Sequence, residues 1–404
     1  MVQIAVLGFG TVGSGVVELI DRNQASIRDR FPEGIYVKYI LDLREFPDSP
    51  YHDRVIHDFN IILNDPEIRI ICETMGGKNP AYAFSKSALE KGISVCTSNK
   101  ELVAAHGPEL LRTAAANNCS YMFEASVGGG IPIIRPLRDA LSQEYITSIA
   151  GILNGTTNYI MTRMEKEDMT FEETLKIAQE KGYAERNPEA DVEGHDACRK
   201  IAILSSLMTG KTVRYEDIPC EGISRITKTD FGYARNMQMG IKLLGMAHRN
   251  EDGSVNVRTA PFLVSRDHPL YSATGVFNAV FVHGNCVDDL MFYGRGAGKL
   301  PTASAVVADV VDCAVNLGRN VDVNWSDEVL APADSSKEVR RFFIRAAAGD
   351  RDSVLSAFGP DLEEAVSDTP VADECAFVTG AMSEAAFEEA AAGIPGIRSW
   401  IRLF

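Results

Sequence analysis

The glycine-rich turn near the start of the chain constrains the fold more than any other segment. An apolar, β-branched run at residues 2–8 (VQIAVLG) leads directly into the sequence GFGTVG at residues 8–13. Where such a turn joins a strand to a helix, the first glycine permits the tight turn and the second lets the backbone approach a pyrophosphate. The third lets the helix pack on the strand, and the helix N-terminus offers free N–H groups to an anion. The pattern predicts a dinucleotide site, with a structural turn as the alternative, and its expected contacts are Gly8, Gly10, Thr11, Val12 and Gly13.

The first third of the chain alternates between predicted strands and predicted helices. Further strands are expected at residues 36–41, 68–74, 93–97 and 121–124, and helices at 12–27, 79–91 and 100–117. This alternation predicts an α/β fold with a Rossmann-type doubly wound parallel sheet. At ~150 residues per domain, a chain of 404 residues should hold two to three domains. We expect the dinucleotide-binding domain at residues 1–130, completed by about 300–323, where an apolar helix (305–316) packs back.

The remaining chain predicts two further domains. Strands at 146–153, 255–264 and 279–284, with helices at 156–166, 171–181 and 196–209, indicate an α+β substrate and dimerisation domain over residues 131–300. The polar stretch 324–337 reads as a linker. Residues 338–404 follow the order βαββαβ, which predicts a small ferredoxin-like domain.

Composition excludes several classes of protein. The chain is 45% hydrophobic and 24% charged, as in globular proteins. Its net charge is −16, so it has no overall positive potential that would attract nucleic acid or an anionic membrane. No apolar run reaches a membrane span, and MVQIAVLGFG has no basic segment that would make it a signal peptide. The eight cysteines form no CxxC pair, which is typical of reduced thiols in a cytoplasm. The seven histidines show no metal-ligand spacing, so no transition metal is expected.

Two further features bear on the cofactor. Asp42 ends the second predicted strand, 29 residues after Gly13, and could hold an adenine ribose if the intervening helix is long. An ordinary turn residue is the alternative. A carboxylate would repel a 2′-phosphate, so NAD is favoured, although the nearby Arg44 leaves NADP open. A second glycine turn, with Gly296 and Gly298, precedes a helix and could also touch the cofactor.

Two lysines are candidates for the chemistry. Lys100 follows the strand at 93–97, at the sheet edge where ligands bind, and could meet the nicotinamide or the substrate; a surface lysine is the alternative. Asp196 and Lys200 stand four apart at the start of a helix, after a loop that contains Glu185. They could form a surface ion pair. However, Lys200 shares its face with the apolar residues Ile203, Leu204 and Leu207, and a desolvated lysine suits proton transfer.

The glycine-rich segment EASVGGGI (residues 124–131) is a candidate cation site. Such a turn can direct several carbonyl oxygens at a small hard cation. A flexible crossover between domains, closed by Pro132, is the alternative.

Together these motifs resemble the homoserine dehydrogenase family. The matching stretches are GFGTVGSGV, TSNKELVA, FEASVGGGIPII, GILNGTTNYI, the segment from GYAE to DVEGHDACRK, and GRGAGKLPTASAVVADV. They occur in the order of the family over residues 3–310. The resemblance implies NAD(P)-dependent interconversion of L-homoserine and L-aspartate 4-semialdehyde, within threonine, methionine and isoleucine biosynthesis.

The resemblance also implies roles for residues. Lys200 matches the proton donor and acceptor, Glu185 the carboxylate that binds substrate, Asp196 a second acid, and Lys100 the lysine near the nicotinamide. A structural monovalent cation such as Na+ would be held, mostly through backbone oxygens, by Glu124, Val127, Gly129 and Ile131. The tail resembles an ACT-type regulatory domain that could sense an amino-acid effector, and a homodimer or higher homo-oligomer is expected.

Two departures and two alternatives accompany the resemblance. Basic residues that NADP-preferring members place near Leu41 are missing, and the tail is compact for an effector domain. One alternative is an aspartate-semialdehyde dehydrogenase, which needs a nucleophilic cysteine, and Cys198 is the cysteine nearest the candidate site. The other is a silent sensor of dinucleotide and amino acid, which would need no proton donor.

Overall fold

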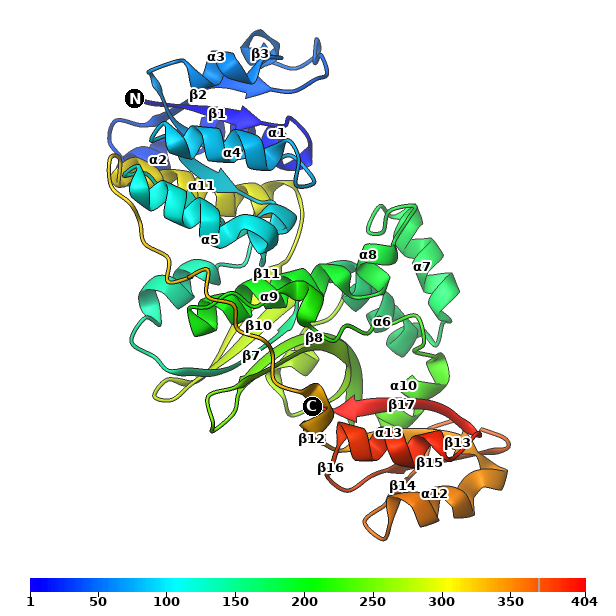
Figure 1. Cartoon of the computed structure of the whole chain (residues 1–404). Coiled ribbons are helices and arrows are strands. Elements are labelled where there is room, and N and C mark those ends of the chain that lie inside the picture. Colours follow the sequence, from blue (N-terminus) through cyan, green and yellow to red (C-terminus); the bar gives the residue numbers. More distant parts are fainter. Residues whose placement is uncertain (370) are drawn as a thin grey trace. The chain divides into compact units, whose positions relative to one another are not determined.

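The computed structural model describes residues 1–369 and 371–404, which form two compact units (Figure 1). The first unit comprises residues 1–144, 202–214 and 294–330, and the second comprises 145–201, 215–293 and 331–404. Among the described residues, no helix combines the length and the apolar character needed to cross a membrane. The predicted division into three domains stays a prediction.

The first unit is built on a six-stranded parallel sheet. Its strands are β1 (Val2–Leu7), β2 (Ile35–Leu41), β3 (Val55–Ile56), β4 (Ile68–Glu73), β5 (Ser94–Thr97) and β6 (Tyr121–Met122). They lie in the order β3-β2-β1-β4-β5-β6, and every pair is parallel. The order reverses between β1 and β4, which is where doubly wound folds bind ligands. The predicted fold class is confirmed.

Helices cover this sheet, as the blue, cyan and yellow ribbons of Figure 1 show. They are α1 (Thr11–Arg22), α2 (Gln24–Arg30), α3 (Phe59–Leu63), α4 (Ala81–Glu90), α5 (Lys100–Ala116) and α11 (Lys299–Val315). Right-handed crossovers leaving β1 and β4 in opposite directions place α1 and α4 on opposite faces. Helix α11 packs on α1 so closely that a Cβ on Gly15 would lie 2.8 Å from the Lys299 carbonyl oxygen. The core between them includes Val6, Val16, Ile20 and Val306.

Two helix predictions for this unit were wrong in their boundaries. The helix expected over 12–27 is two helices, α1 and α2, which meet at Asn23 (φ −107°, ψ 23°). Asparagine has a low helix propensity, and Asn23 takes non-helical dihedral angles here without a side-chain hydrogen bond to the start of α2. Helix α11 begins at Lys299 and not at Ala305, since Pro301 in its first turn is compatible with a helix start.

The first half of the segment predicted as a linker, residues 324–330, belongs to the first unit, and residues 331–337 belong to the second. Trp325 is buried, contacts Phe123 edge-on, and donates a hydrogen bond from Nε1 to Thr212 Oγ1 at 3.1 Å. Its ring also packs against Gly107, where an added Cβ would lie only 2.8 Å from the nearest ring atom. Polar composition indicated a flexible connection, but one tryptophan anchors this stretch of chain.

The second unit contains a nine-stranded mixed sheet. Its strands are β7 (Ile146–Ile152), β8 (Met239–Arg249), β9 (Val255–Ser265), β10 (Phe277–Gly284), β11 (Asp288–Arg295), β13 (Phe342–Ala347), β14 (Glu363–Ala365), β15 (Glu374–Val378) and β17 (Ile397–Leu403). Their order is β11-β10-β7-β8-β9-β17-β13-β15-β14. Helices α6 (Gly155–Glu167) and α10 (Lys228–Asn236) pack on β8. Between them in sequence come α7 (Phe171–Glu180), α8 (Glu189–Val192) and α9 (His195–Thr209).

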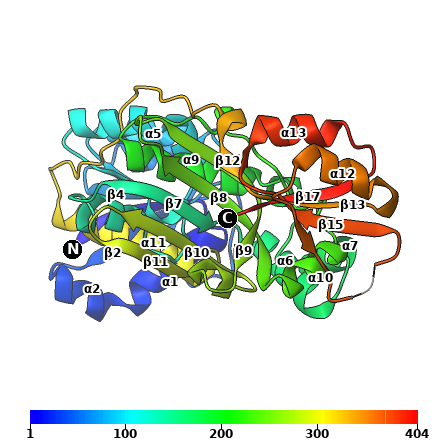
Figure 2. The same ribbon diagram turned by 90° about the horizontal axis from the view of Figure 1, so that it is seen from below.

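The tail forms one continuous sheet with the rest of this unit (Figure 2). Its four main strands and the helices α12 (Arg351–Phe358) and α13 (Glu384–Ala392) follow the predicted βαββαβ order. The two-residue strands β12 (Val339–Arg340) and β16 (Met382–Ser383) pair separately. Strand β17 joins the tail to β9 in parallel, with Arg402 opposite Phe262. The ferredoxin-like arrangement is therefore present, and it extends the larger sheet.

Candidate active site and cofactor site

The predicted glycine turn has the geometry that close phosphate approach requires. Gly8 has a φ of +90°, which favours glycine, and Gly10 is the N-cap of α1. A Cβ on Gly13 would lie 1.8 Å from the Gly8 carbonyl oxygen, so only glycine fits there. The Thr74 hydroxyl, directly after β4, shares its one hydrogen between the carbonyl oxygens of Leu7 and Gly8, each 2.9 Å away. The turn is thus fixed at the switch point, with the start of α1 open to an anion.

Asp42 lies beside this turn, directly after β2. Its Oδ2 accepts a hydrogen bond from the Phe9 N–H at 2.8 Å, which ties it to the glycine turn. The Arg44 guanidinium donates to both carboxylate oxygens, at 3.0 and 2.9 Å, and holds the pKa of Asp42 well below its usual range. A carboxylate that favours its ionised form and an adjacent, exposed guanidinium therefore lie together at this point.

Lys100 is the first residue of α5, at the carboxyl edge of the same sheet. Asn99 is the N-cap of that helix: its side chain accepts from the Leu102 N–H at 3.1 Å and donates to the Gly77 carbonyl at 2.6 Å. Residues at the carboxyl ends of parallel strands border the ligand crevice in such folds. This position agrees with the predicted role of Lys100, which stays a prediction.

Glu73 at the same edge was missed by sequence reasoning. It is the last residue of β4 and fully buried, accepting hydrogen bonds from Thr97 Oγ1 at 2.5 Å and from the Met75 N–H at 2.8 Å. Burial raises the pKa of Glu73 to about 7. The only sequence signal was a carboxylate ending the otherwise apolar strand IRIICE, a pattern with many other causes.

In the second unit, Asp196 and Lys200 form a buried ion pair on the first two turns of α9. Lys200 Nζ lies 2.8 Å from Asp196 Oδ2 and donates a hydrogen bond to the Leu153 carbonyl at 2.7 Å. Only 8% of Lys200 and 4% of Asp196 is exposed, so the alternative of a surface ion pair is wrong. Among the described residues, these two oxygens are the acceptors of the Lys200 ammonium.

Two residues that sequence reasoning did not single out complete this cluster. Asn154, between β7 and α6, donates from Nδ2 to Asp196 Oδ2 at 2.9 Å and to Asp191 Oδ1 at 2.7 Å. Asp191 belongs to the short helix α8 inside the segment predicted as a loop. We refer to Asn154, Asp191, Asp196 and Lys200 as the lysine cluster. Its members come from three elements, so no local spacing could have revealed Asn154 as a partner.

Glu185 lies in the turn after α7 with its side chain exposed. Its backbone carbonyl accepts a hydrogen bond from Gln179 Nε2 at 3.0 Å. The structure therefore places the side chain outside the hydrogen-bonded lysine cluster. The predicted role in substrate binding stays a prediction.

The predicted cation loop is buried and closely packed within the first unit. The Glu124 carboxylate accepts hydrogen bonds from the N–H groups of Ile133, Ile134 and Arg135 at 2.6–2.9 Å. Because the oxygens of this carboxylate already accept these N–H groups, a cation in the loop would be bound mainly by backbone carbonyl oxygens. A Cβ on Gly129 would lie 2.1 Å from the Gly296 carbonyl oxygen, so the two predicted glycine turns pack together. The donor set suits a hard cation.

Gly298, the other glycine predicted to touch the cofactor, is exposed and is the N-cap of α11. Its φ of +124° favours glycine. A helix start with no side chain at its cap resembles the start of α1, where Gly10 occupies the same position.

Cys198 does not have the environment of a nucleophile. It is buried on α9, and its Sγ donates to the Tyr215 carbonyl at 3.5 Å. Hydrogen bonding with Cys220, together with burial, raises the pKa of the Cys198 thiol. A buried, protonated thiol is a poor nucleophile, which argues against Cys198 as the nucleophile of an aldehyde oxidation.

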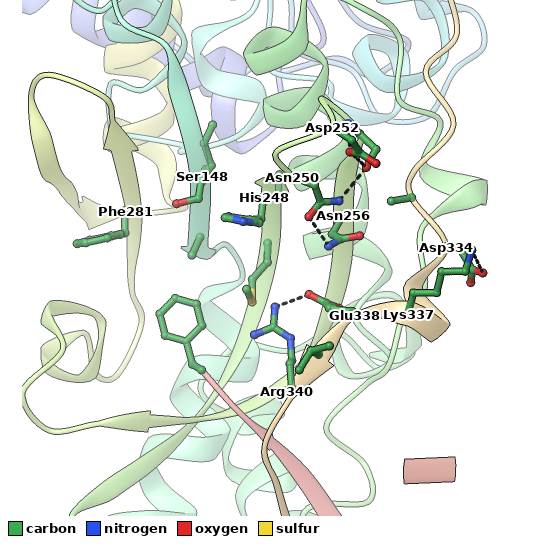
Figure 3. Close-up of a pocket in the computed structure, with 18 residues that line it drawn as sticks. Ser148, His248, Asn250, Asp252, Asn256, Phe281, Asp334, Lys337, Glu338 and Arg340 are labelled. Carbon is green, nitrogen blue, oxygen red and sulfur yellow. Dashed lines mark hydrogen bonds and ion pairs between the residues drawn. The ribbon is translucent and has the colours of Figure 1, made fainter. Parts of the chain in front are cut away.

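A cavity of about 790 Å³ also lies in the second unit (Figure 3). Ser148 on β7, His248 on β8 and Phe281 on β10 line one side, and Glu338 and Arg340 line the other. None of the predicted site residues lines it. Concavity alone therefore identifies neither candidate site: the one in the second unit rests on the lysine cluster, and the cofactor site of the first unit rests on the glycine turn.

Comparison with known proteins identifies the family of this chain. A family model described as homoserine dehydrogenase matches residues 132–311, and one described as homoserine dehydrogenase, NAD binding domain, matches residues 8–124. The homoserine dehydrogenase of Synechocystis sp. is 45% identical over 318 residues, which cover 77% of this chain and 73% of the relative. That of Bacillus subtilis is 38% identical over 369 residues, covering 88% and 84%.

Solved structures agree as well. A homoserine dehydrogenase from Thiobacillus denitrificans superposes with a TM-score of 0.87 at 32% identity, covering 100% of this chain and 98% of that one. A hyperthermophilic archaeal homoserine dehydrogenase in complex with NADPH has a TM-score of 0.67 at 26% identity, covering 78% and 98%. With relatives of this identity aligned over most of both chains, this chain belongs to the homoserine dehydrogenase family.

Proposed function

We propose that this homoserine dehydrogenase uses Lys200 as the proton donor and acceptor of its reaction. The observation that carries the proposal is the buried lysine cluster, in which one ammonium is held by the Asp196 carboxylate and the Leu153 carbonyl. A nicotinamide cofactor supplies or removes the hydride when bound. The other requirement, a proton at the substrate oxygen, falls to the chain itself.

Charge explains why a held ammonium suits this step. When hydride reaches the carbonyl carbon of L-aspartate 4-semialdehyde, negative charge grows on the aldehyde oxygen. An ammonium in a poorly hydrated site stabilises that charge and can pass a proton to it, which forms the hydroxyl of homoserine. In the reverse direction, the neutral amine accepts the hydroxyl proton. Because two acceptors already orient Lys200 Nζ, the ammonium loses little further conformational freedom when the reaction takes place.

We assign two acidic residues of the chain to binding of the ammonium group that the substrate carries. Glu185 is exposed in a loop, where its carboxylate can reach a ligand, and Asp196 adds negative charge near Lys200. An ion pair with the substrate ammonium would fix which face of the aldehyde receives hydride. We assign Lys100 to the nicotinamide region or the substrate, which its place at the carboxyl edge of the sheet supports.

For the cofactor, we propose NAD as the preferred dinucleotide and NADP as an accepted one. The Asp42 carboxylate beside the glycine turn suits ribose hydroxyls, and its charge opposes a 2′-phosphate. The exposed Arg44 can turn from Asp42 to such a phosphate. A hyperthermophilic archaeal homoserine dehydrogenase is in complex with NADPH in its solved structure, which supports NADP as an accepted cofactor here.

Three further assignments extend the proposal. The carbonyls of Glu124, Val127, Gly129 and Ile131 would hold a structural monovalent cation such as Na+. The ferredoxin-like tail is proposed as an ACT-like domain for an amino-acid effector. A cytoplasmic homodimer or higher oligomer serving threonine and methionine biosynthesis fits the family.

A spectrophotometric assay tests the proposal against its alternatives. The purified chain should reduce NAD+ when L-homoserine is added, and the rate should persist after alkylation of exposed thiols. NAD+ reduction that requires phosphate and aspartate semialdehyde, and that is lost on alkylation, would favour thiol-dependent aldehyde oxidation. If the chain reduces NAD+ neither with L-homoserine nor with phosphate and aspartate semialdehyde, a silent sensor is favoured.

A further inference from the structure

We propose that Asn154 is a positioning residue of the reaction, because its amide holds the Asp196 carboxylate in the orientation that presents the Lys200 ammonium to substrate. This inference rests on the proposed role of Lys200. Asn154 is 6% exposed and lies where β7 ends and α6 begins. It would act through the two ionic residues and need not touch the reacting atoms.

The Asn154 amide has both its ends engaged. Its Nδ2 donates to Asp191 Oδ1 at 2.7 Å and to Asp196 Oδ2 at 2.9 Å. Its Oδ1 accepts from the Thr157 N–H at 2.8 Å and from Thr157 Oγ1 at 3.1 Å. Turning the amide over would place an oxygen against two carboxylates and an NH2 group against a backbone N–H. The orientation is therefore determined by the network.

The same short segment also fixes Lys200. Asp196 Oδ2, which accepts from Asn154, is the oxygen 2.8 Å from Lys200 Nζ. The carbonyl of Leu153, one residue before, accepts from Nζ at 2.7 Å. The backbone of Leu153 and the side chain of Asn154 therefore hold the ammonium and its counter-ion from one point of the chain. A rotation of the Asp196 carboxylate would move the ammonium away from its present direction.

Asparagine is the residue type that this position requires. Ser, Thr, Asp and Asn all act as N-caps, so capping of α6 alone does not select among them. A serine has one O–H donor on a short side chain and cannot bridge two carboxylates. An aspartate would bring a third carboxylate against Asp191 and Asp196. Only asparagine both caps the helix and supplies two neutral N–H donors.

Asn154→Ser separates the two roles, since serine keeps the cap and loses the bridge. We expect kcat to fall about tenfold or more, while the melting temperature and the KM for NAD+ change little. Thr170→Ala is the matched control: Thr170 caps α7 through the Glu173 N–H, away from the cluster. That variant should lose stability and keep its kcat. Should Asn154→Ser fail to fold, Asn154→Asp, which also keeps a cap, should show a larger loss of kcat.

A double-mutant cycle with Asp196→Ala decides whether Asn154 acts through Asp196. We expect Asn154→Ser to have less than a twofold further effect on kcat in the Asp196→Ala background. The same tenfold loss in both backgrounds, or an unchanged kcat for the single variant, would overturn the inference. Lys200→Ala separates this outcome from failure of the proposed function. If Lys200→Ala is inactive while Asn154→Ser is normal, only the positioning role fails; if Lys200→Ala is normal, the role of Lys200 fails.

Discussion

Glu73 shows how a single buried carboxyl group can make stability depend on pH. Its pKa of about 7 in the folded chain lies above the reference value of 4.5, because burial disfavours the charged form. Between these values the folded chain binds a proton that the unfolded chain releases. Stability therefore falls as pH rises through that window.

We expect Glu73→Gln to be more stable than the parent protein at pH 8, by about 1–3 kcal/mol. Near pH 4.5 the difference should be small, because the parent carboxyl is then protonated as well. Urea denaturation at both pH values measures this. The control is Glu33→Gln, at an exposed position. A stability difference that does not vary with pH would contradict the argument.

Arg44 is the residue whose removal should change cofactor preference. The guanidinium is the basic group beside Asp42, and a 2′-phosphate would need it. Arg44→Ala should lower kcat/KM for NADP+ about tenfold, because a charge-assisted hydrogen bond to phosphate is lost, and should change the value for NAD+ much less. Steady-state kinetics with both cofactors give the result, with the exposed Arg28→Ala as control. Equal losses for the two cofactors would show that Arg44 only orders Asp42.

At the scale of elements, the β1-turn-α1 unit was predictable because all its signals are local. The apolar strand, three glycines and a helix start fall within about twelve residues, and the structure places the helix at Thr11–Arg22. Strand β8 (MGIKLLGMAHR) was missed, since burial on both faces removes the alternation that marks a strand. Helix α10 and strand β11 were missed as well. Asn154 could not be identified because the two carboxylates that it bridges lie 37 and 42 residues further along the sequence, and Glu73 because its side-chain partner Thr97 lies 24 residues away.

Two glycines of the turn separate folding from cofactor binding. A Cβ at Gly13 would collide with the Gly8 carbonyl, whereas at Gly10 it would meet no atom of the chain within 4 Å. Gly13→Ala should therefore lower the melting temperature by several degrees. Gly10→Ala should keep its stability and raise the KM for NAD+, because the methyl group stands where the pyrophosphate approaches. Thermal melts of both variants, with kinetics for Gly10→Ala, test this. Equal stability of the two would contradict the packing argument.

At the scale of the whole molecule, buried charges fasten the tail to the rest of the second unit. Arg345 on β13 donates to Asp230 Oδ1 of α10 at 2.7 Å and to Glu374 Oε1 of β15 at 2.8 Å. The buried Arg402 on β17 pairs with Glu221, which lies outside the tail, at 2.7 Å. Together with the pairing of β17 and β9, these contacts predict that the tail and the substrate-domain sheet unfold as one.

Removing Arg345 should therefore destabilise more than the tail. Arg345→Met leaves the fully buried Asp230 without its cation, and such a loss costs about 3–5 kcal/mol. The control Arg351→Ala breaks an exposed pair with Glu364 and should cost less than ~1 kcal/mol. Calorimetry measures both. A separate, early transition of the tail in Arg345→Met would show that the two parts unfold independently.

The central claim is that the Lys200 ammonium delivers the proton as the aldehyde is reduced. The most direct measurement is the single-turnover rate of NADH oxidation by L-aspartate 4-semialdehyde in Lys200→Ala, alongside the dissociation constant for NADH. The control is Lys228→Ala, at an exposed ion pair with Asp168. We predict a rate at least about 100-fold lower with unchanged NADH affinity, because general acid catalysis is lost. A rate equal to that of the parent enzyme would contradict the account.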